Sequence, residues 1–183
     1  MKRGTLTAML ILAIGGSAIG QAKYLSNEGN IIFFSHTALE DITAENMEVA
    51  SVLDSETGEV VVLVQMTAFE FEKKKMQEHF NENYVESETF PKATFRGKIL
   101  NNADVDYATK GRYDIQLEGE MSIHGVAKQV SARGSLEVIT GGLIARTKFL
   151  LNPEDYNIKI PKVVRKNISE NMEIRVEINH KVI

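Results

Sequence analysis

Strict alternation of apolar and polar residues between positions 113 and 123 is the feature that most constrains how this chain can fold. Every odd-numbered residue from Tyr113 to Ile123 is apolar or glycine, and the residues between them are polar. Successive side chains of a strand point to opposite faces, so one face of this strand is expected to be buried and the other hydrated. Similar one-sided alternation recurs in segments 47–53, 130–138, 143–151 and 172–178. Roughly eight such strands at short spacing predict an all-β fold, either an antiparallel barrel or a sandwich.

Tight turns between these strands favour the barrel. His124-Gly125 and Gly141-Gly142 are expected to close hairpins, and Gly29-Asn30 is expected to form a turn between two short N-terminal strands. Strands joined in this way run as a meander, and closing a meander removes exposed sheet edges. A barrel of about eight strands can be filled by side chains or can hold one small ligand.

Small residues at inward positions leave two explanations open. These residues are Gly97, Gly119, Ala132, Gly134 and Ala145. They could leave volume inside the barrel that larger side chains would have filled. Alternatively, the glycines could relieve strain where strands bend sharply.

One short amphipathic helix is expected within the sheet protein, over residues 72–83. Met76, Phe80 and Tyr84 recur at i, i+4 and i+8, and charged residues occupy the other faces. Pro91 then directs the chain into a new strand. The helix is therefore expected to cover something apolar.

Residues 1–22 have the pattern of a secretory signal peptide. Lys2 and Arg3 precede an apolar run, and Gly20 and Ala22 occupy the small positions that a signal peptidase reads. The apolar run is shorter than the roughly 20 residues needed to span a bilayer. We expect cleavage near Ala22, a barrel domain over residues 23–183, and a periplasmic or secreted location.

Charge and cysteine content narrow the classes of partner. Without the signal segment, 19 basic and 25 acidic residues remain, and the chain has no cysteine. This balance argues against nucleic acid or an anionic membrane surface as the main partner. We interpret the basic segment 162–166 as a hydrated loop. The absence of cysteine excludes disulfides and thiol catalysis.

Histidines are the strongest candidates for chemistry, but none has a convincing pattern. His79 lies in the sequence HFNEN, which lacks the second histidine that a helical HExxH zinc motif requires. We expect His79 to hydrogen-bond locally or to lie at the barrel mouth, and His124 to stabilise its turn. His36 and His180 have no partner that the sequence identifies. We therefore expect no catalytic residue, no metal and no cofactor.

Three motifs resemble the YceI-like family of exported bacterial proteins: HFNENYVESETFPKATFRG (79–97), GEMSIHGVAKQV (119–130) and DYNIKIP (155–161). The resemblance implies a lipocalin-like barrel with a helix at one end that holds a polyisoprenoid or similar lipid. It also implies that Phe69, Phe71, Met76, Phe80, Phe90 and Phe95 build the apolar lining near the helix.

The resulting functional hypothesis is a lipid-binding protein, not an enzyme, that stores or transports an isoprenoid or quinone-like lipid. Two alternatives are a barrel enzyme acting on a hydrophobic substrate and a stress-related structural protein with a packed interior. A homodimer is left open. The expected ligand-binding residues are Phe33, Phe69, Phe71, Met76, His79, Phe80, Tyr84, Phe90, Phe95, Met121 and Phe149.

Overall fold

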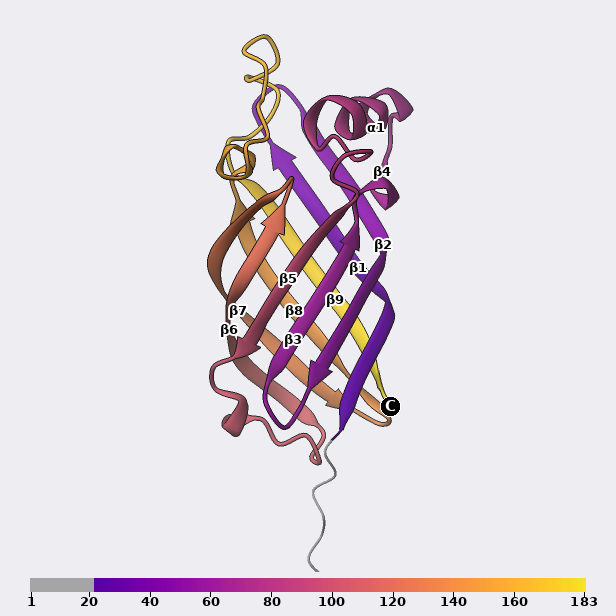
Figure 1. Ribbon diagram of the computed structural model, residues 1–183, viewed down its shortest axis with the longest axis vertical. Helices are drawn as coiled ribbons and strands as arrows, with labels where there is room; N and C mark the ends of the chain where they lie inside the picture. The colour runs from indigo at the N-terminus through magenta and orange to yellow at the C-terminus, as the bar shows by residue number, and fades with distance from the viewer. Residues whose placement is uncertain (1–21) are drawn as a thin grey trace, which may run out of the picture.

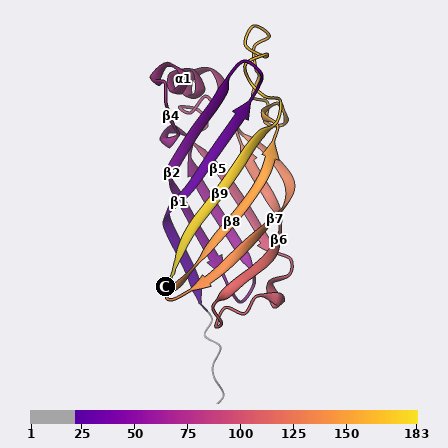
Figure 2. The same cartoon turned by 180° about the vertical axis from the view of Figure 1, so that it is seen from behind.

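A closed antiparallel barrel forms the body of the protein in the computed structural model, which describes residues 22–183 (Figures 1 and 2). Within these residues, eight long strands follow the order β1-β9-β8-β7-β6-β5-β3-β2, and β2 pairs with β1 to close the ring. Their bounds are β1 (Lys23–His36), β2 (Asp41–Asp54), β3 (Glu59–Gln65), β5 (Lys92–Ile99), β6 (Gly111–Ile123), β7 (Val126–Ile139), β8 (Gly142–Leu151) and β9 (Met172–Val182). A two-residue strand, β4 (Glu70–Phe71), pairs with β2. The predicted eight-stranded barrel is confirmed, whereas the expected signal segment, apart from Ala22, lies outside the described residues.

The β6–β7 hairpin follows the prediction, and the β7–β8 hairpin differs from it by one residue. Ile123 pairs with Val126, so His124 and Gly125 form the two-residue turn, both with positive φ. In the second hairpin Gly142 already pairs with Ile139. The turn is therefore Thr140-Gly141, and the prediction of Gly141-Gly142 was wrong. Gly142 is instead the first residue of β8, where a Cβ would clash with the backbone oxygen of His180.

The N-terminal segment forms one long strand, so the predicted turn at Gly29-Asn30 was wrong. The pairing of β1 with β2 shifts register on both sides of Gly29, as a β-bulge does. A Cβ at Gly29 would lie only 3.0–3.1 Å from atoms of Ile178 and Val49. This glycine permits close approach inside a continuous strand, where the sequence suggested a break.

The register shift on the C-terminal side of Gly29, where β2 has the extra residue, reverses the expected orientation of Met47. Its side chain is 64% exposed, because the register shift places Met47 and Glu48 both outside and returns Val49 to the interior. Asn46 is fully buried instead. Its amide group donates to the Gln65 carbonyl at 2.7 Å, and its Oδ1 accepts from the Glu48 amide at 2.8 Å. Both polar ends of this buried side chain are thus paired.

The predicted helix is present at one end of the barrel (Figure 1). It consists of α1 (Lys74–His79) followed by a π-helical turn, η2 (Phe80–Tyr84), so it begins two residues later than expected. Three short 3-10 turns complete the structure: η1 (Met66–Ala68), η3 (Asn102–Asp104) and η4 (Pro153–Tyr156). The basic segment 162–166 lies in the connection from η4 to β9 and is largely exposed, as predicted.

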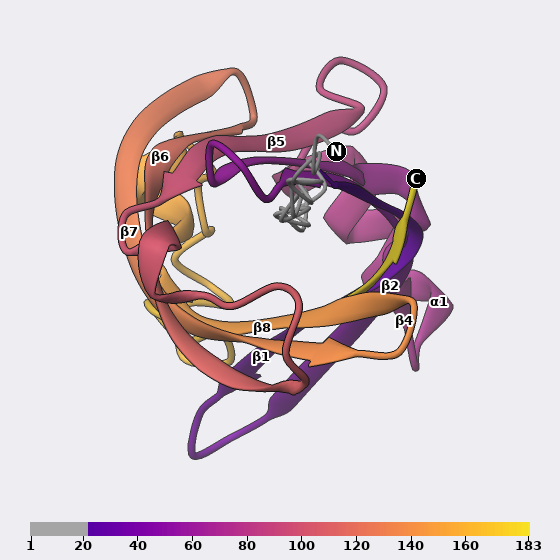
Figure 3. The ribbon, with the colours of Figure 1, turned by 90° about the horizontal axis from the view of Figure 1, so that it is seen from below.

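The barrel has a separate apolar cluster toward each end. We call the end that carries the helical segment 74–84 the helix end, and the opposite end the closed end. At the closed end the segment between β5 and β6 crosses beneath the strands (Figure 3). Val105 from this segment is buried with Leu53, Ile99 and Leu143. The Tyr107 hydroxyl donates to Asn102 at 2.6 Å, and burial raises the pKa of this phenol. Buried apolar side chains and an ordered loop therefore seal this end.

Close backbone contact explains two of the inward glycines. Gly97 and Gly119 face each other across β5 and β6. A Cβ at Gly119 would clash with the Arg96 carbonyl oxygen and with Gly97 itself. By contrast, Ala132 and Ala145 line the cavity described below. Backbone geometry thus accounts for these glycines, while the alanines contribute to interior space.

Candidate ligand-binding cavity

A cavity of about 400 Å³ extends inside the barrel from the helix end to the closed end. Ligand sites in proteins commonly occupy about 300–1,000 Å³, so this volume suits a small molecule. Inward side chains of β6 line it from Ile115 to Ile123, which corresponds to about 27 Å of strand. With the strand tilt usual in barrels, the cavity is about 20 Å deep along the axis. An extended chain therefore fits its shape better than a compact molecule.

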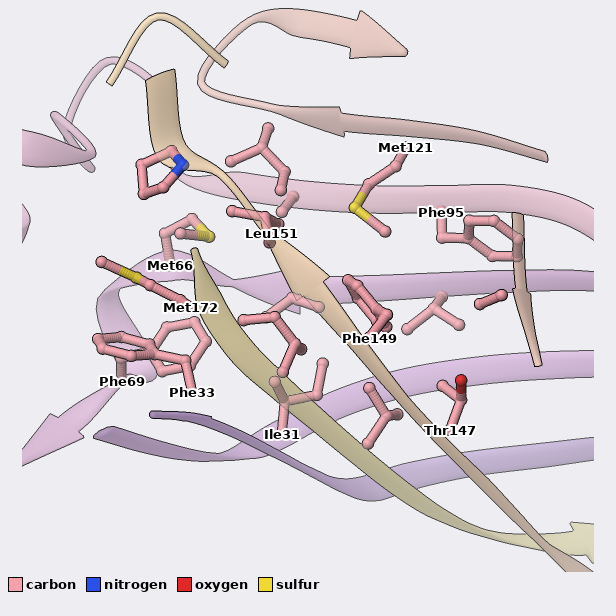
Figure 4. Close-up of a pocket in the computed structure, with 18 of the residues that line it drawn as sticks. Ile31, Phe33, Met66, Phe69, Phe95, Met121, Thr147, Phe149, Leu151 and Met172 are labelled. Carbon is pink, nitrogen blue, oxygen red and sulfur yellow. The ribbon is translucent and has the colours of Figure 1, made fainter. Parts of the chain in front are cut away.

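Apolar side chains from many strands make up most of the wall (Figure 4). Ile31 and Phe33 come from β1, Met121 from β6, and Phe149 and Leu151 from β8. They meet inside because the two-residue period of each strand turns every second side chain inward. The wall can therefore shelter a hydrocarbon chain from water.

Four phenylalanines form an aromatic cluster beneath the helix. The Phe80 ring lies with its centroid 5.1 Å from Phe71, 5.5 Å from Phe69 and 5.7 Å from Phe33. These separations are typical of favourable aromatic pairs. Phe80 thus anchors the helical segment over the barrel interior.

Ten of the eleven sequence-predicted residues line this cavity: Phe33, Phe69, Phe71, Met76, His79, Phe80, Tyr84, Phe95, Met121 and Phe149. Phe90 does not. It precedes β5, and its ring packs on His124 at 4.4 Å and occupies the space beside Gly125. The expectation that Phe90 lines the cavity was wrong, because the chain enters the barrel wall only after Pro91. Ligand contact by the other ten remains a prediction.

Polar residues gather at the helix end around Glu40. Its carboxylate accepts hydrogen bonds from Lys73 Nζ at 3.2 Å and from Asn167 Nδ2 at 3.1 Å. Both hydrogen bonds lower the pKa of Glu40, and the bond from Asn167 has the larger effect. His79 and Tyr84 also line the cavity at this end. The β1–β2 turn, the start of the helix and the loop before β9 are thus connected around the mouth.

His124 lies outside the cavity and connects three segments. Its Nδ1 is 3.1 Å from the Tyr156 carbonyl oxygen, and its Nε2 is 3.2 Å from Glu86 Oε2. These contacts hold the β6–β7 turn against η4 and the segment after the helix. Within residues 22–183 no cluster of three or more His, Cys, Asp or Glu side chains could hold a metal ion.

Among the cavity residues that sequence reasoning missed, Ser51 and His180 form a hydrogen-bonded pair. His180 Nε2 lies 2.9 Å from Ser51 Oγ, and both side chains are buried at the closed end of the cavity. Burial lowers the pKa of His180 to about 4, against a weaker opposing effect of the Ile178 carbonyl. One signal was available, because His180 continues the inward alternation of Met172 to Ile178.

Acid is expected to destabilise the fold through His180. Its pKa falls from 6.5 to about 4 on folding, so between these pH values the unfolded chain binds a proton that the folded chain does not. The free energy of unfolding should therefore fall by about 3 kcal/mol as pH drops from 6.5 to 4, and this contribution is fully present above pH 6.5. Urea unfolding of the native chain and of His180→Phe across this range measures it. Parallel pH profiles for the two proteins would contradict the expectation.

The sequence model of the YceI-like domain family matches residues 25–180 of this chain. The chain belongs to the YceI-like family. No curated protein sequence matches it, and no helix in the described part of the YceI-like chain is long and apolar enough to cross a membrane.

Three solved structures resemble this YceI-like barrel. A polyisoprenoid-binding domain from Saccharophagus degradans, implicated in plant cell wall breakdown, has a TM-score of 0.77 at 12% identity and covers 90% of this chain and 100% of its own. BcnA from Burkholderia cenocepacia has a TM-score of 0.69 at 11% identity, covering 82% and 95%. The YceI protein of Campylobacter jejuni has a TM-score of 0.50 at 16% identity, covering 99% of both chains. At these identities the likeness establishes a shared fold.

Proposed function

We propose that this chain is an exported binding protein that holds the apolar chain of an isoprenoid or similar amphiphilic lipid inside its barrel. The observation that carries the proposal is the long cavity with an almost wholly apolar wall. The family assignment supports it, as does the polyisoprenoid-binding description of the Saccharophagus degradans domain. Its role would be passive, sheltering a lipid from water during storage or transfer.

Burial of hydrocarbon supplies enough free energy for this function. Each methylene transferred from water to an apolar interior contributes about 0.8 kcal/mol. A chain that runs the depth of the cavity therefore binds tightly without charged contacts. Pro153 and Leu151 near the helix end and Leu136 at the closed end all belong to the wall, so apolar contact continues over its whole length.

An enzyme would need a reactive pair in the cavity, and Ser51 with His180 is the arrangement that comes closest. A serine nucleophile requires a histidine that accepts its proton and a third group that orients the imidazole. The pKa of His180, lowered to about 4, makes this ring a weak base, and its Nδ1 has no partner among the described residues. These features favour binding over hydrolysis. The cavity also argues against the packed interior expected of a purely structural protein.

The helical segment fits the role of a lid, because its aromatic side lies on the cavity and its charged residues face outward.

Export is proposed from the signal pattern of residues 1–22. The contacts of Ala22 depend on where the signal peptide is cleaved. The Ala22 carbonyl oxygen accepts hydrogen bonds from the Ser55 amide at 3.2 Å and from the Ser55 hydroxyl at 2.8 Å. Cleavage before Ala22 would retain these contacts, and cleavage after it would remove them.

Native mass spectrometry of the protein purified from its own host tests the function. A stoichiometric adduct is expected, and organic extraction should release an isoprenoid or related lipid. Denaturing mass measurement of the same sample gives the N-terminus and hence the cleavage site. Delipidated protein should take up an added polyprenol. A bare protein that takes up neither polyprenol nor quinone would contradict the proposal.

A further inference from the structure

The floor of the cavity combines one polar pair with completely buried apolar side chains. Leu53, Ile99 and Leu136 line the cavity at the closed end with exposures of 0–1%. Ser51 and His180 lie among them and also line the cavity, with exposures of 2% and 3%. A polar pair at this depth is costly unless its hydrogen-bonding groups are satisfied.

One of those groups is not satisfied. His180 Nε2 is paired with Ser51 Oγ, but Nδ1 has no hydrogen-bond partner among the described residues. The nearby Ile178 carbonyl raises the pKa of the ring, but it does not lie in a position to form a hydrogen bond with Nδ1. A buried imidazole nitrogen normally has a partner in protein or solvent. Nδ1 itself has almost no accessible surface, but its side chain borders the cavity, so a small rotation of the ring would present this nitrogen to a molecule that reaches the floor.

The chemistry at the floor suits an uncharged partner. Since its pKa is lowered to about 4, His180 is neutral at pH 7 and offers one donor and one acceptor nitrogen. Arg146 belongs to the same region of wall, but its guanidinium is paired with Glu137 at 2.6 Å and with Glu177 at 2.7 Å on the outer face. A phosphate or carboxylate placed at the floor would therefore lose its hydration without gaining a cation.

We propose that Ser51 and His180 form a subsite for a single uncharged hydrogen-bonding group, a hydroxyl or a carbonyl, at the end of an apolar chain. This inference rests on the proposed lipid-binding function and adds the ligand's orientation and class. The polar end lies at the closed end, the chain runs along the apolar wall, and its tail reaches the aromatic cluster under the helix. Lipids with a charged head group are selected against at this subsite.

Binding of geranylgeraniol is compared with binding of the C20 hydrocarbon that lacks its hydroxyl and with geranylgeranyl phosphate. The native chain should bind the alcohol about fivefold to tenfold more tightly than the hydrocarbon, as expected for one neutral hydrogen bond. His180→Phe and Ser51→Ala should abolish this preference while retaining hydrocarbon binding. Thr147→Val is the matched control. It also removes a hydroxyl from the wall, but that hydroxyl already donates to the Arg133 carbonyl at 2.8 Å, so the preference should remain.

A spectroscopic measurement on the native chain avoids dependence on the folding of variants. Nitrogen NMR of ¹⁵N-labelled histidine should show a change at His180 Nδ1 when the alcohol binds and little change when the hydrocarbon binds. Equal affinity for alcohol and hydrocarbon, or an unchanged Nδ1 signal on alcohol binding, would overturn the subsite while leaving lipid binding intact. Failure of all three ligands to bind would overturn the proposed function and the subsite with it.

Discussion

A Phe80→Asp substitution is expected to reduce lipid affinity by at least about 100-fold, because it places a carboxylate against the apolar wall. Phe80 lines the cavity and contacts the rings of Phe33, Phe69 and Phe71. The substitution removes the central ring of this cluster and hydrates the contact between helix and barrel. Titration of delipidated protein with a fluorescent polyprenol analogue measures the loss.

Glu82→Ala is the matched control for this experiment. Glu82 belongs to the same helical turn as Phe80, but its side chain is exposed and does not line the cavity. Affinity should therefore stay within twofold of the native value. Far-ultraviolet circular dichroism should show the barrel in both variants, since its strands close without the helix. Lipid retention by a folded Phe80→Asp chain would contradict the assignment of this wall as the binding surface.

A Gly119→Val substitution is expected to lower the free energy of unfolding by about 3 kcal/mol or more. The Cβ alone would clash with the Arg96 carbonyl oxygen and the Gly97 backbone, and neither can move without breaking the β5–β6 pairing. Urea unfolding followed by circular dichroism measures the change. Gly119→Ala provides a milder version that should also be destabilised, because it already carries the clashing atom.

Gly111→Val is the matched control in the same strand. Gly111 begins β6 and is exposed, and the atoms nearest to a Cβ there would be Tyr113 side-chain atoms at 3.5–3.7 Å, which is ordinary van der Waals contact. This variant should remain within about 0.5 kcal/mol of the native chain. If the two positions tolerate valine equally, close backbone approach is not the reason for glycine at position 119.

The sequence predicted the fold best where alternation is unbroken. In β6 and β7 the period of two persists over whole strands, so strand, face and hairpin turn all followed from local pattern. The prediction was wrong in β1 and at Met47, because a bulge shifts the period by one residue. A bulge is defined by pairing with a second strand, and β1 gave no local sign of that pairing apart from Gly29, which was interpreted as a turn.

The cavity residues divide in the same way, into those that the local sequence pattern identified and those whose position depends on distant segments. Phenylalanine, tyrosine and methionine residues at inward or helix-stripe positions were identified from periodicity and family resemblance, and nine of them line the cavity, as His79 does. Phe90 was misplaced because its position depends on where β5 enters the wall. The pair Ser51 and His180 was missed because its members are 129 residues apart, and no local pattern brings them together.

The sequence by itself therefore determined most of the strands, the direction of most side chains, the helix and the apolar character of the interior. These properties depend on neighbours a few residues apart, and the strand and helix periods encode them directly. Only the tertiary structure decided that the ring joins the N-terminal strand β1 to the C-terminal strand β9, that the interior remains hollow, and that Nδ1 of His180 has no hydrogen-bond partner among residues 22–183. Those properties depend on register and packing between distant segments, which are set only when the whole barrel forms.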